Sequence, residues 1–160
     1  MRPGVSTNSH NASTTSRELY YVAAMIHETP IAVRFYELDP YRHLNHSVYI
    51  QYFETGRIDL FKEMGWSLTQ MSDLGTQVVV ASIETQFMAP GVENDELVVE
   101  TWVEDVKRVS MHFGQRIVRG DEVLATQTVH GACTSLEGRP KRIPEDLLVG
   151  LRRFAPPDGE

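Results

Sequence analysis

The longest helical pattern in the sequence lies between Asn45 and Gly65. Apolar or small side chains recur there at the three- and four-residue spacing of one helix face. They are Tyr49, Ile50, Phe53, Gly56, Leu60, Phe61 and Met64. Asn45 and Ser47 are good N-cap residues, and Gly65 suits the left-handed conformation that ends many helices. The sequence therefore predicts a helix from between Asn45 and Ser47 to about Met64. Gly56, inside the stripe, predicts close approach to a sheet.

Five β-strands are predicted before and after this helix, from apolar–polar alternation, a β-branched segment and the tight turn signal Gly120-Asp121. The first covers residues 31–36, and four longer strands cover residues 77–88, 97–106, 109–118 and 123–136. Residues 67–75 are expected to form a connection, and a short closing helix is expected to open around Pro144. Long antiparallel strands with one long helix predict an α+β domain, in which a curved sheet wraps around the helix.

Both ends of the chain are expected to lie outside this domain. Residues 1–27 contain much Ser, Thr and Asn, which predicts a disordered or loosely packed tail. Residues 28–150 then form the domain, and residues 151–160 a frayed tail. The apolar run 19–26 is short and follows many polar residues, so it is a poor secretory signal. The N-terminal tail also has a weak likeness to an organelle transit peptide, but the expected location is the cytoplasm.

Composition excludes several classes of protein. The net charge of −7 argues against general nucleic-acid binding, which needs a basic surface. The single cysteine, Cys133, excludes an internal disulfide and a cysteine cluster for zinc. No stretch approaches the roughly 20 apolar residues of a membrane span, so no membrane contact is expected. An open sheet edge calls for a second copy related by a two-fold axis, and we expect at least a homodimer, with a homotetramer as the alternative.

The turn before the helix and the helix itself carry a spaced motif. Its members are Asp39, Pro40, His43, Leu44, Asn45, Tyr49, Phe53, Glu54 and Arg57. Two further marks follow: Phe87-Met88-Ala89-Pro90, and a segment around Gly138-Arg139-Pro140 that ends at Pro144. In this order, over about residues 29–148, the chain resembles the hotdog-fold thioesterases of the 4-hydroxybenzoyl-CoA thioesterase type.

The resemblance implies a hotdog domain that hydrolyses acyl-CoA thioesters, or sometimes thioesters of acyl carrier protein. It implies no metal and no cofactor, since coenzyme A is part of the substrate. It also implies dimers or tetramers with active sites at subunit interfaces. In one branch an aspartate at the position of Asp39 is catalytic, and in another a helix carboxylate, for which Glu54 is the nearest candidate. The chain departs from the usual pattern at Arg42, where glycine is common, and at His46, where asparagine is common, so substrate identity stays open.

Hydrolysis of a thioester needs a base or nucleophile and hydrogen-bond donors for the developing oxyanion. Asp39 is our candidate for base or nucleophile, and the alternative is that it only caps the turn. Backbone N–H groups near His46 and Ser47 are expected to hold the oxyanion, because a helix start carries unpaired donors and partial positive charge. The His46 ring is expected to face the core and border the site, unless it is a half-buried histidine at a helix end. Asn45 is expected to organise the loop or contact the thioester, and His43 to hold the loop.

Substrate contacts are predicted along the helix and beyond. Tyr49, Phe53, Phe87 and Met88 are candidates for an acyl pocket, either short and aromatic or longer. Arg57 projects toward the apolar face three residues after Glu54, which predicts an internal ion pair. The alternative is that Glu54 faces the substrate pocket.

Basic residues are needed for the phosphates of coenzyme A. Lys107 with Arg108, and Arg139 with the basic residues after it, are the candidates; solvated turns are the alternative for each. Asp39, His43 and His46 have side chains that can ligate a metal, but no second cluster supports them, so no metal site is predicted.

The predicted activity is that of an acyl-CoA thioesterase. Two alternatives stay open: hydrolysis of acyl-carrier-protein thioesters, and a non-catalytic acyl-binding domain.

Overall fold

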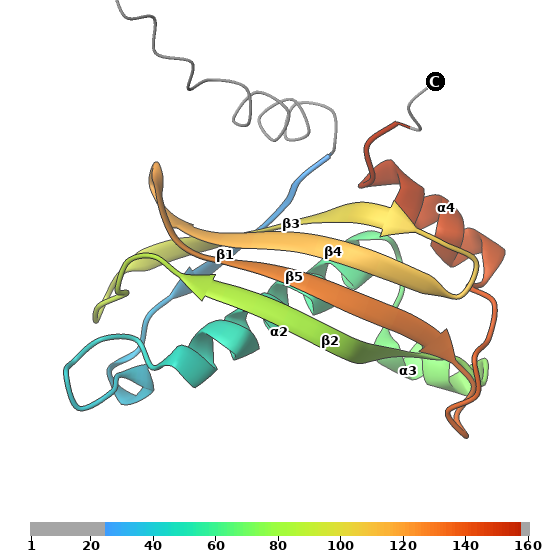
Figure 1. Cartoon of the computed structure of the whole chain (residues 1–160), viewed down its shortest axis with the longest axis horizontal. Coiled ribbons are helices and arrows are strands. Elements are labelled where there is room, and N and C mark those ends of the chain that lie inside the picture. Colours follow the sequence, from blue (N-terminus) through green and yellow to red (C-terminus); the bar gives the residue numbers. More distant parts are fainter. Residues whose placement is uncertain (1–24, 158–160) are drawn as a thin grey trace, which may run out of the picture.

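Within residues 25–157, which the computed structural model describes, a five-stranded antiparallel sheet curves around one long helix (Figure 1). The strands lie in the order β1-β3-β4-β5-β2 and are β1 (His27–Ala32), β2 (Gln77–Phe87), β3 (Glu96–Val106), β4 (Ser110–Arg119) and β5 (Glu122–Thr134). The helices are the 3-10 turn η1 (Phe35–Glu37) and the α-helices α2 (His46–Glu63), α3 (Leu68–Asp73) and α4 (Glu145–Arg153). This arrangement confirms the predicted α+β class.

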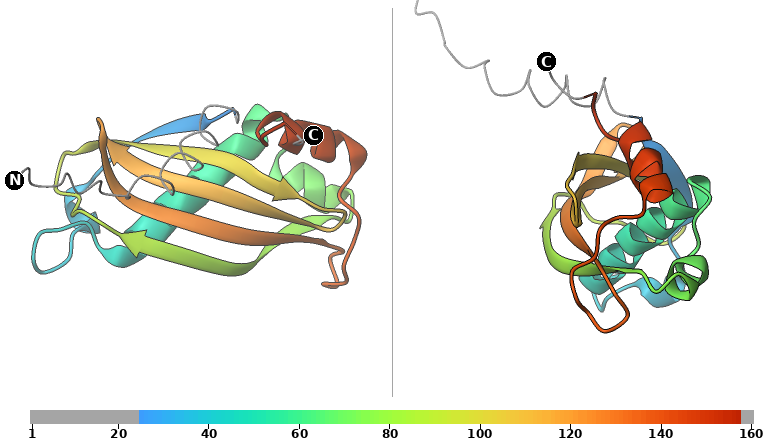
Figure 2. Two further views of the ribbon diagram at one scale, coloured as in Figure 1. Left: turned by 45° about the horizontal axis from the view of Figure 1, so that its top comes forward. Right: turned by 90° about the vertical axis from the view of Figure 1, so that its right-hand side faces the viewer.

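The helix α2 lies along the inner face of the sheet (Figure 2). Its apolar stripe is buried there. Its first half packs in one core cluster with β3, β4 and β5, and Phe53 and Val99 are fully enclosed there. Its second half packs in another cluster with α3 and α4, around Leu60, Phe113 and Leu147. The core therefore holds the start of α2 in a fixed position against the sheet.

Gly56 lies where α2 comes closest to the sheet. A Cβ atom placed on it meets Val99 Cγ1 at 2.7 Å and Thr101 Oγ1 at 2.9 Å, which no real side chain tolerates without movement. The close helix–sheet contact predicted from this glycine is thus confirmed. Larger residues here force the helix away from β3 and β4.

Two predicted segments differ from the structure near the N-terminal end of the domain. The first strand runs from His27 to Ala32, and the predicted strand over residues 31–36 was placed too late. Phe35 instead belongs to η1 and is 72% exposed, stacked edge-on against Tyr36. The alternation was read correctly only as far as Val33, which is 2% exposed and bonds to the β2–β3 turn.

The C-terminal boundary of the domain was also placed too early. Helix α4 runs to Arg153, and both Leu151 and Phe154 are buried in the core, where residues from 151 onward were expected to fray. The predicted connection over residues 67–75 contains α3, whose N-cap is Ser67. The N-terminal tail predicted over residues 1–27 lies almost wholly outside the described residues. No helix in the described part of the chain is long and apolar enough to cross a membrane.

Strand β2 forms one edge of the sheet, and its outer edge has no strand partner among the described residues. It is 11 residues long, and its side chains include several exposed apolar ones. In β2 and just after it these are Val79, Val80, Ile83, Phe87 and Met88. A long apolar edge strand with free backbone groups is a surface that pairs with another strand.

Candidate active site

The segment before α2 is a closed loop that carries Asp39. The N–H of Asn45 donates to the carbonyl oxygen of Glu37 at 2.9 Å, and the N–H of Asp39 donates to that of His43 at 2.7 Å. Leu38 and Leu44 form a β-bridge between these bonds. These bonds close the loop and lead the chain into the first turn of α2. They also fix the position of Asp39.

The Asp39 carboxylate uses one oxygen to hold this loop. Its Oδ1 atom accepts the backbone N–H groups of Tyr41 at 2.8 Å and of His43 at 3.1 Å. Its Oδ2 atom has no hydrogen-bond partner within residues 25–157, and the residue is half-buried. Asp39 therefore does cap the turn, through Oδ1, while Oδ2 remains able to accept a proton or to act as a nucleophile.

Arg42 lies in the same turn with a φ of +64°, in the left-handed region. Its N–H donates to the carbonyl oxygen of Asp39 at 2.9 Å. Glycine adopts this conformation without the steric cost that a Cβ atom brings. The turn therefore has the backbone shape that glycine favours at this position, although an arginine occupies it.

The first turn of α2 leaves one backbone donor without an acceptor. Asn45 is the N-cap, and its Oδ1 accepts the backbone N–H of Ser47 at 3.0 Å. Val48 N–H donates to the carbonyl oxygen of Asn45 at 2.9 Å. The N–H of His46 has no acceptor among the described residues, so it is the free donor at the positive end of the helix.

The His46 ring does not lie where the sequence predicted it. The residue is exposed rather than on the core side of α2, because it is the first residue of the helix and its side chain lies outside the buried stripe. His43 is exposed as well, and it takes part in the loop through its backbone groups. A role for either ring in substrate binding stays a prediction.

Tyr49 and Phe87 meet at the same end of α2. Their rings contact edge-on, with centroids 5.3 Å apart. Tyr49 is buried, and its hydroxyl donates to the carbonyl oxygen of Ala89 and accepts the N–H of Gly91. Burial raises the pKa of this hydroxyl, so it stays protonated. Phe87 is 52% exposed and is available to a ligand, whereas Tyr49 holds the β2–β3 loop.

Arg57 is buried under the sheet, but its partners are amides rather than Glu54. Its Nη1 atom donates to Gln115 Oε1 at 2.7 Å and to Gln127 Oε1 at 3.0 Å. The predicted ion pair with Glu54 is wrong in the described structure: no contact within 4.0 Å joins the two charges. Burial lowers the pKa of the Arg57 guanidinium, and the nearby Glu54 charge opposes that shift.

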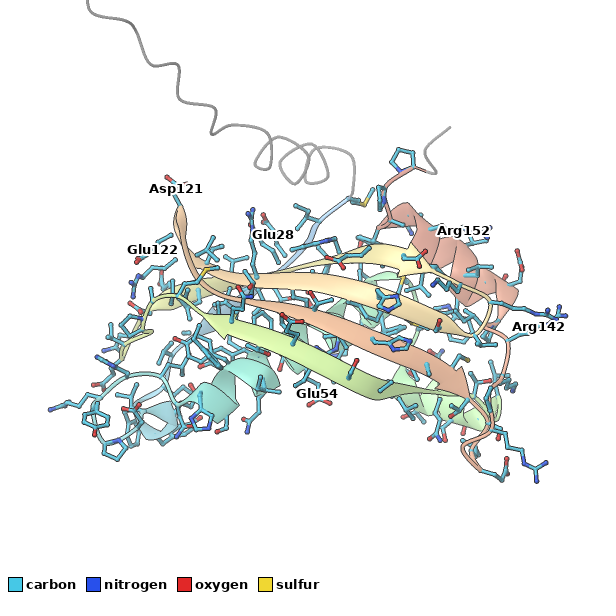
Figure 3. All side chains as sticks on the ribbon, in the orientation of Figure 1. Glu28, Glu54, Asp121, Glu122, Arg142 and Arg152 are labelled. Atoms are coloured by element: carbon cyan, nitrogen blue, oxygen red, sulfur yellow. The ribbon has the colours of Figure 1, made fainter. Side chains whose placement is uncertain are left out.

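Phe53 and Glu54 lie on α2, two turns beyond the helix start that follows the Asp39 loop. Phe53 is 0% exposed and belongs to the core, so its predicted contact with substrate is not open in a single chain. Glu54 is exposed, and in Figure 3 its side chain projects past the edge strand β2. Eight residues separate it from His46, about 12 Å along a helix. Within one chain, Glu54 and Asp39 therefore do not form a common site.

The predicted phosphate-binding residues lie at the opposite end of the sheet from Asp39. Lys107 and Arg108 are in the β3–β4 turn, and the Arg108 carbonyl accepts the N–H of Ile143. Arg139 is exposed, and the turn after β5 to which it belongs lies at that same end (Figure 1). The adjacent Lys141 is already used: its ammonium donates to the carbonyl oxygens of Leu74 and Gly75 and to the Thr76 hydroxyl. A single chain does not bring these charges to the Asp39 loop.

An open cavity of about 480 Å³ lies at that far end, beyond the C-terminal end of α2. Its walls are Gly65, Trp66, Gln70, Asp73, Leu74 and Asp146. Leu74 is 61% exposed, so the cavity has an apolar wall open to solvent. In the part of the chain that the structure describes, no group of three His, Cys, Asp or Glu side chains can hold a metal ion.

Two residues beside the loop were not predicted from the sequence. Glu37 ends η1, and its carboxylate accepts the hydroxyl of Tyr52, a buried residue of α2. The signal for Tyr52 was a hydroxyl-bearing ring next to Phe53 on the buried stripe, since a buried tyrosine needs a partner for its O–H. For Glu37 it was a second acid two residues before Asp39.

The antiparallel sheet curved around α2, with a carboxylate loop at the helix start, defines a hotdog domain. The profile of the thioesterase-like superfamily matches residues 33–151. The chain belongs to this superfamily, which confirms the predicted resemblance and makes the protein a member of a family of thioester hydrolases.

Several relatives share this domain. The chain is 26% identical over 127 residues to the acyl-CoA thioesterase YbgC of Haemophilus influenzae, covering 78% of this chain and 93% of that protein. It is 28% identical over 130 residues to the chloroplastic acyl-acyl carrier protein thioesterase ATL2 of Arabidopsis thaliana, covering 80% of this chain and 69% of that protein. The crystal structure of Slr0204, a 1,4-dihydroxy-2-naphthoyl-CoA thioesterase from Synechocystis, superposes with a TM-score of 0.75 at 15% identity, over 80% of this chain and 96% of that one. This last likeness concerns the fold.

Proposed function

We propose that the protein hydrolyses acyl-CoA thioesters, with the carboxylate of Asp39 and the N–H of His46 acting on the same carbonyl group. The observation that carries this proposal is that the two oxygens of Asp39 have different environments. Asp39 Oδ1 holds the loop, whereas Oδ2 and the His46 N–H at the start of α2 have no hydrogen-bond partner within residues 25–157. Thioester hydrolysis needs a base and a preorganised oxyanion donor, and these two groups can supply them.

In the base route, Asp39 Oδ2 takes a proton from a water molecule as the water oxygen bonds to the carbonyl carbon. The carbonyl oxygen becomes negative and accepts the N–H of His46, at the positive end of the helix dipole. The C–S bond then breaks, and the coenzyme A thiolate leaves and takes up the proton. The products are the free acid and the thiol.

In the nucleophile route, Asp39 Oδ2 itself bonds to the carbonyl carbon and the thiolate leaves. Water then hydrolyses the mixed anhydride and restores the carboxylate. Both routes use only protein groups and water, so we propose that no metal or cofactor takes part. We propose the cytoplasm as the compartment.

We propose further that the active form is at least a homodimer joined through β2. The support is the free edge of this strand and its exposed apolar side chains, among them Val80 (53% exposed) and Ile83 (44% exposed). Two copies related by a two-fold axis pair their β2 strands antiparallel. The Gln77 end of one strand then lies beside the Phe87 end of the other.

This pairing completes the site. Phe87 contacts Tyr49 at the start of α2, and Gln77 follows directly on the segment of α3 and Leu74. Gln77 also pairs with Thr134, just before the turn that carries Arg139. A second copy therefore carries its own Leu74 wall and its basic turn to the Asp39 loop of the first. The apolar wall suits an acyl group, and the arginine suits a phosphate.

A second candidate substrate is an acyl group on carrier protein, which the likeness to ATL2 favours. The net charge of −7 counts mildly against it, because acyl carrier proteins are acidic. Hydrolysis of the same acyl group on coenzyme A and on carrier protein, compared by kcat/KM, decides between the two.

The central test is the substitution Asp39→Asn. The amide oxygen of the new side chain still accepts the loop N–H groups, while the group can no longer act as base. We expect kcat on a panel of acyl-CoAs to fall by at least about 100-fold, the low end of the range for general-base catalysis. The matched control is Asp121→Asn, in the exposed turn between β4 and β5, with wild-type turnover expected.

A folded Asp39→Asn protein with near-normal release of free thiol refutes the proposed role of this carboxylate. If the wild-type protein binds acyl-CoAs tightly and releases no thiol, the protein is a binding domain. Single turnover in ¹⁸O-water tests the nucleophile route: label enters the Asp39 carboxylate when water attacks the Asp39 carbonyl carbon of the anhydride, and never in the base route.

A further inference from the structure

The loop that carries Asp39 is tied to α2 by a bond between two side chains. The Tyr52 hydroxyl donates to Glu37 Oε2, and the backbone N–H of Arg34 donates to the same oxygen at 2.8 Å. The Arg34 guanidinium contacts Glu37 Oε1 at 3.2 Å. Tyr52 is 3% exposed, and the Glu37 side chain is 10% exposed, so both partners are shielded from water.

Glu37 lies where the two ends of the loop meet, a position called here the neck of the loop. Its own carbonyl oxygen accepts the N–H of Asn45, the last residue before α2, and Asp39 follows it by two positions. A carboxylate this well buried is costly unless donors surround it, and the three donors here meet that requirement. The arrangement therefore fixes one side of the loop to the second turn of a rigid helix.

A second tyrosine, one turn earlier on α2, fixes the other side. Tyr49 binds the Ala89 carbonyl and the Gly91 N–H, and the Gly91 carbonyl accepts the N–H of Leu44. Tyr49 thus reaches the loop only through the β2–β3 segment, whereas Tyr52 reaches it directly through Glu37. Both anchors come from the helix whose first N–H is the proposed oxyanion donor.

We infer that Tyr52 and Glu37 are a positioning pair, which sets the place of the Asp39 carboxylate relative to the start of α2. This inference rests on the proposed hydrolysis. The base and the oxyanion donor must converge on one carbonyl group, and one is on a loop while the other is on a helix. Small errors in such placement cost large factors in rate, up to about 100-fold for about 1 Å. Burial, and then the hydrogen bond to Glu37, raise the pKa of the Tyr52 hydroxyl well above its ordinary value of 10.0, so the hydroxyl stays a donor.

The test removes the single hydroxyl with Tyr52→Phe in the full chain. We expect kcat per folded molecule to fall at least about 10-fold with KM changed less than about 3-fold, because binding groups are untouched. Glu37→Gln keeps an acceptor oxygen for the tyrosine but turns an amide N–H₂ toward the Arg34 guanidinium, so its kcat is expected to fall less than that of Tyr52→Phe. The matched control is Tyr36→Phe, whose ring is 65% exposed, with unchanged kinetics expected.

Hydrogen exchange of the Leu44 and Asn45 amides supplies a readout that does not depend on activity. These two N–H groups bond to Gly91 and Glu37 across the neck, and we expect faster exchange in Tyr52→Phe. A turnover loss that only follows the unfolded fraction, or a kcat within 2-fold of wild type, overturns the inference. If the wild-type protein hydrolyses no thioester, the proposed function fails. Unchanged hydrogen exchange of the Leu44 and Asn45 amides in Tyr52→Phe refutes the positioning pair independently of activity.

Discussion

The side-chain oxygen of Asn45 lies 2.8 Å from the hydroxyl of Ser47 and 3.0 Å from its backbone nitrogen. This cap removes the Ser47 N–H from the set of free donors at the start of α2. The oxyanion site predicted around His46 and Ser47 is thereby reduced to the N–H of His46. Asn45 consequently has two separable effects, one on helix stability and one on the charge beside that donor.

The first prediction separates these effects. Asn45→Asp keeps a capping oxygen, so we expect a melting temperature close to wild type. Its negative charge opposes an oxyanion at His46, so kcat is expected to fall at least about 10-fold. Asn45→Ala instead loses the cap, at a cost of about 1 kcal/mol in the free energy of unfolding. Wild-type turnover in the aspartate variant contradicts the placement of the oxyanion.

The second prediction concerns the close contact at Gly56. Gly56→Ala gains about 1 kcal/mol of helix propensity but overpacks the contact with Val99 and Thr101, which costs about 1–3 kcal/mol. We expect a net loss in the free energy of unfolding, measured by urea denaturation. Thr55→Ala, on the exposed face of the same turn, is the control and is expected not to destabilise the protein.

The third prediction concerns the buried guanidinium of Arg57. Arg57→Met leaves the Oε1 atoms of Gln115 and Gln127 without their donor, at about 1–3 kcal/mol for each unsatisfied group. Gln127→Met in the same chain removes one of these orphaned acceptors. The double variant is therefore expected to lose less stability than the two single variants summed. Strictly additive losses show that the bonds to Gln127 carry no coupling.

The fourth prediction is a pH dependence at the contact between β1 and α2. The hydrogen bond from His27, and then that from Thr29, lower the pKa of Asp59 below its ordinary value of 3.8, against the effect of burial. A lowered folded-state pKa means that the contribution to stability is fully present above the unfolded value and is lost as pH falls through the folded value. We expect Asp59→Asn to be less stable than wild type at pH 6.

The same variant is expected to converge with wild type in acid, below the ordinary value. Thermal unfolding at a series of pH values between 2 and 6, approximately the range in which carboxylates titrate, checks this. Asp73→Asn, at an exposed position of α3, serves as the control with a constant offset. A difference between Asp59→Asn and wild type that does not shrink in acid shows that the contact does not depend on the charge.

The fifth prediction concerns the free edge of β2. Ile83→Lys places a charge among its exposed apolar side chains and is expected to shift sedimentation from dimer toward monomer. Activity is expected to fall with the dimer, because the second copy supplies part of the proposed site. Val149→Lys, at an exposed position of α4, is expected to change neither. A wild-type protein that sediments as an active monomer contradicts the shared site.

The sequence alone determined the long elements of the fold. The limits of α2 follow from local chemistry, since Asn45 caps its start and Gly65, with a φ of +82°, follows its end. The long strands follow from local signals as well: β-branched residues in β2, apolar–polar alternation in β3, and the turn signal at Gly120-Asp121 between β4 and β5. Asp39 was identified by its place in the turn and by resemblance to a family. None of these inferences needed a contact between distant residues.

Only the tertiary structure decided which partner each functional side chain bonds to. Whether Arg57 pairs with Glu54 or with two glutamines depends on β4 and β5, which lie far away in the sequence. The link between Tyr52 and Glu37 is of the same kind, because a side chain finds its partner by packing and not by spacing. The ends of the domain were misjudged for this reason too: Leu151 and Phe154 are buried by elements that no local pattern near them reveals.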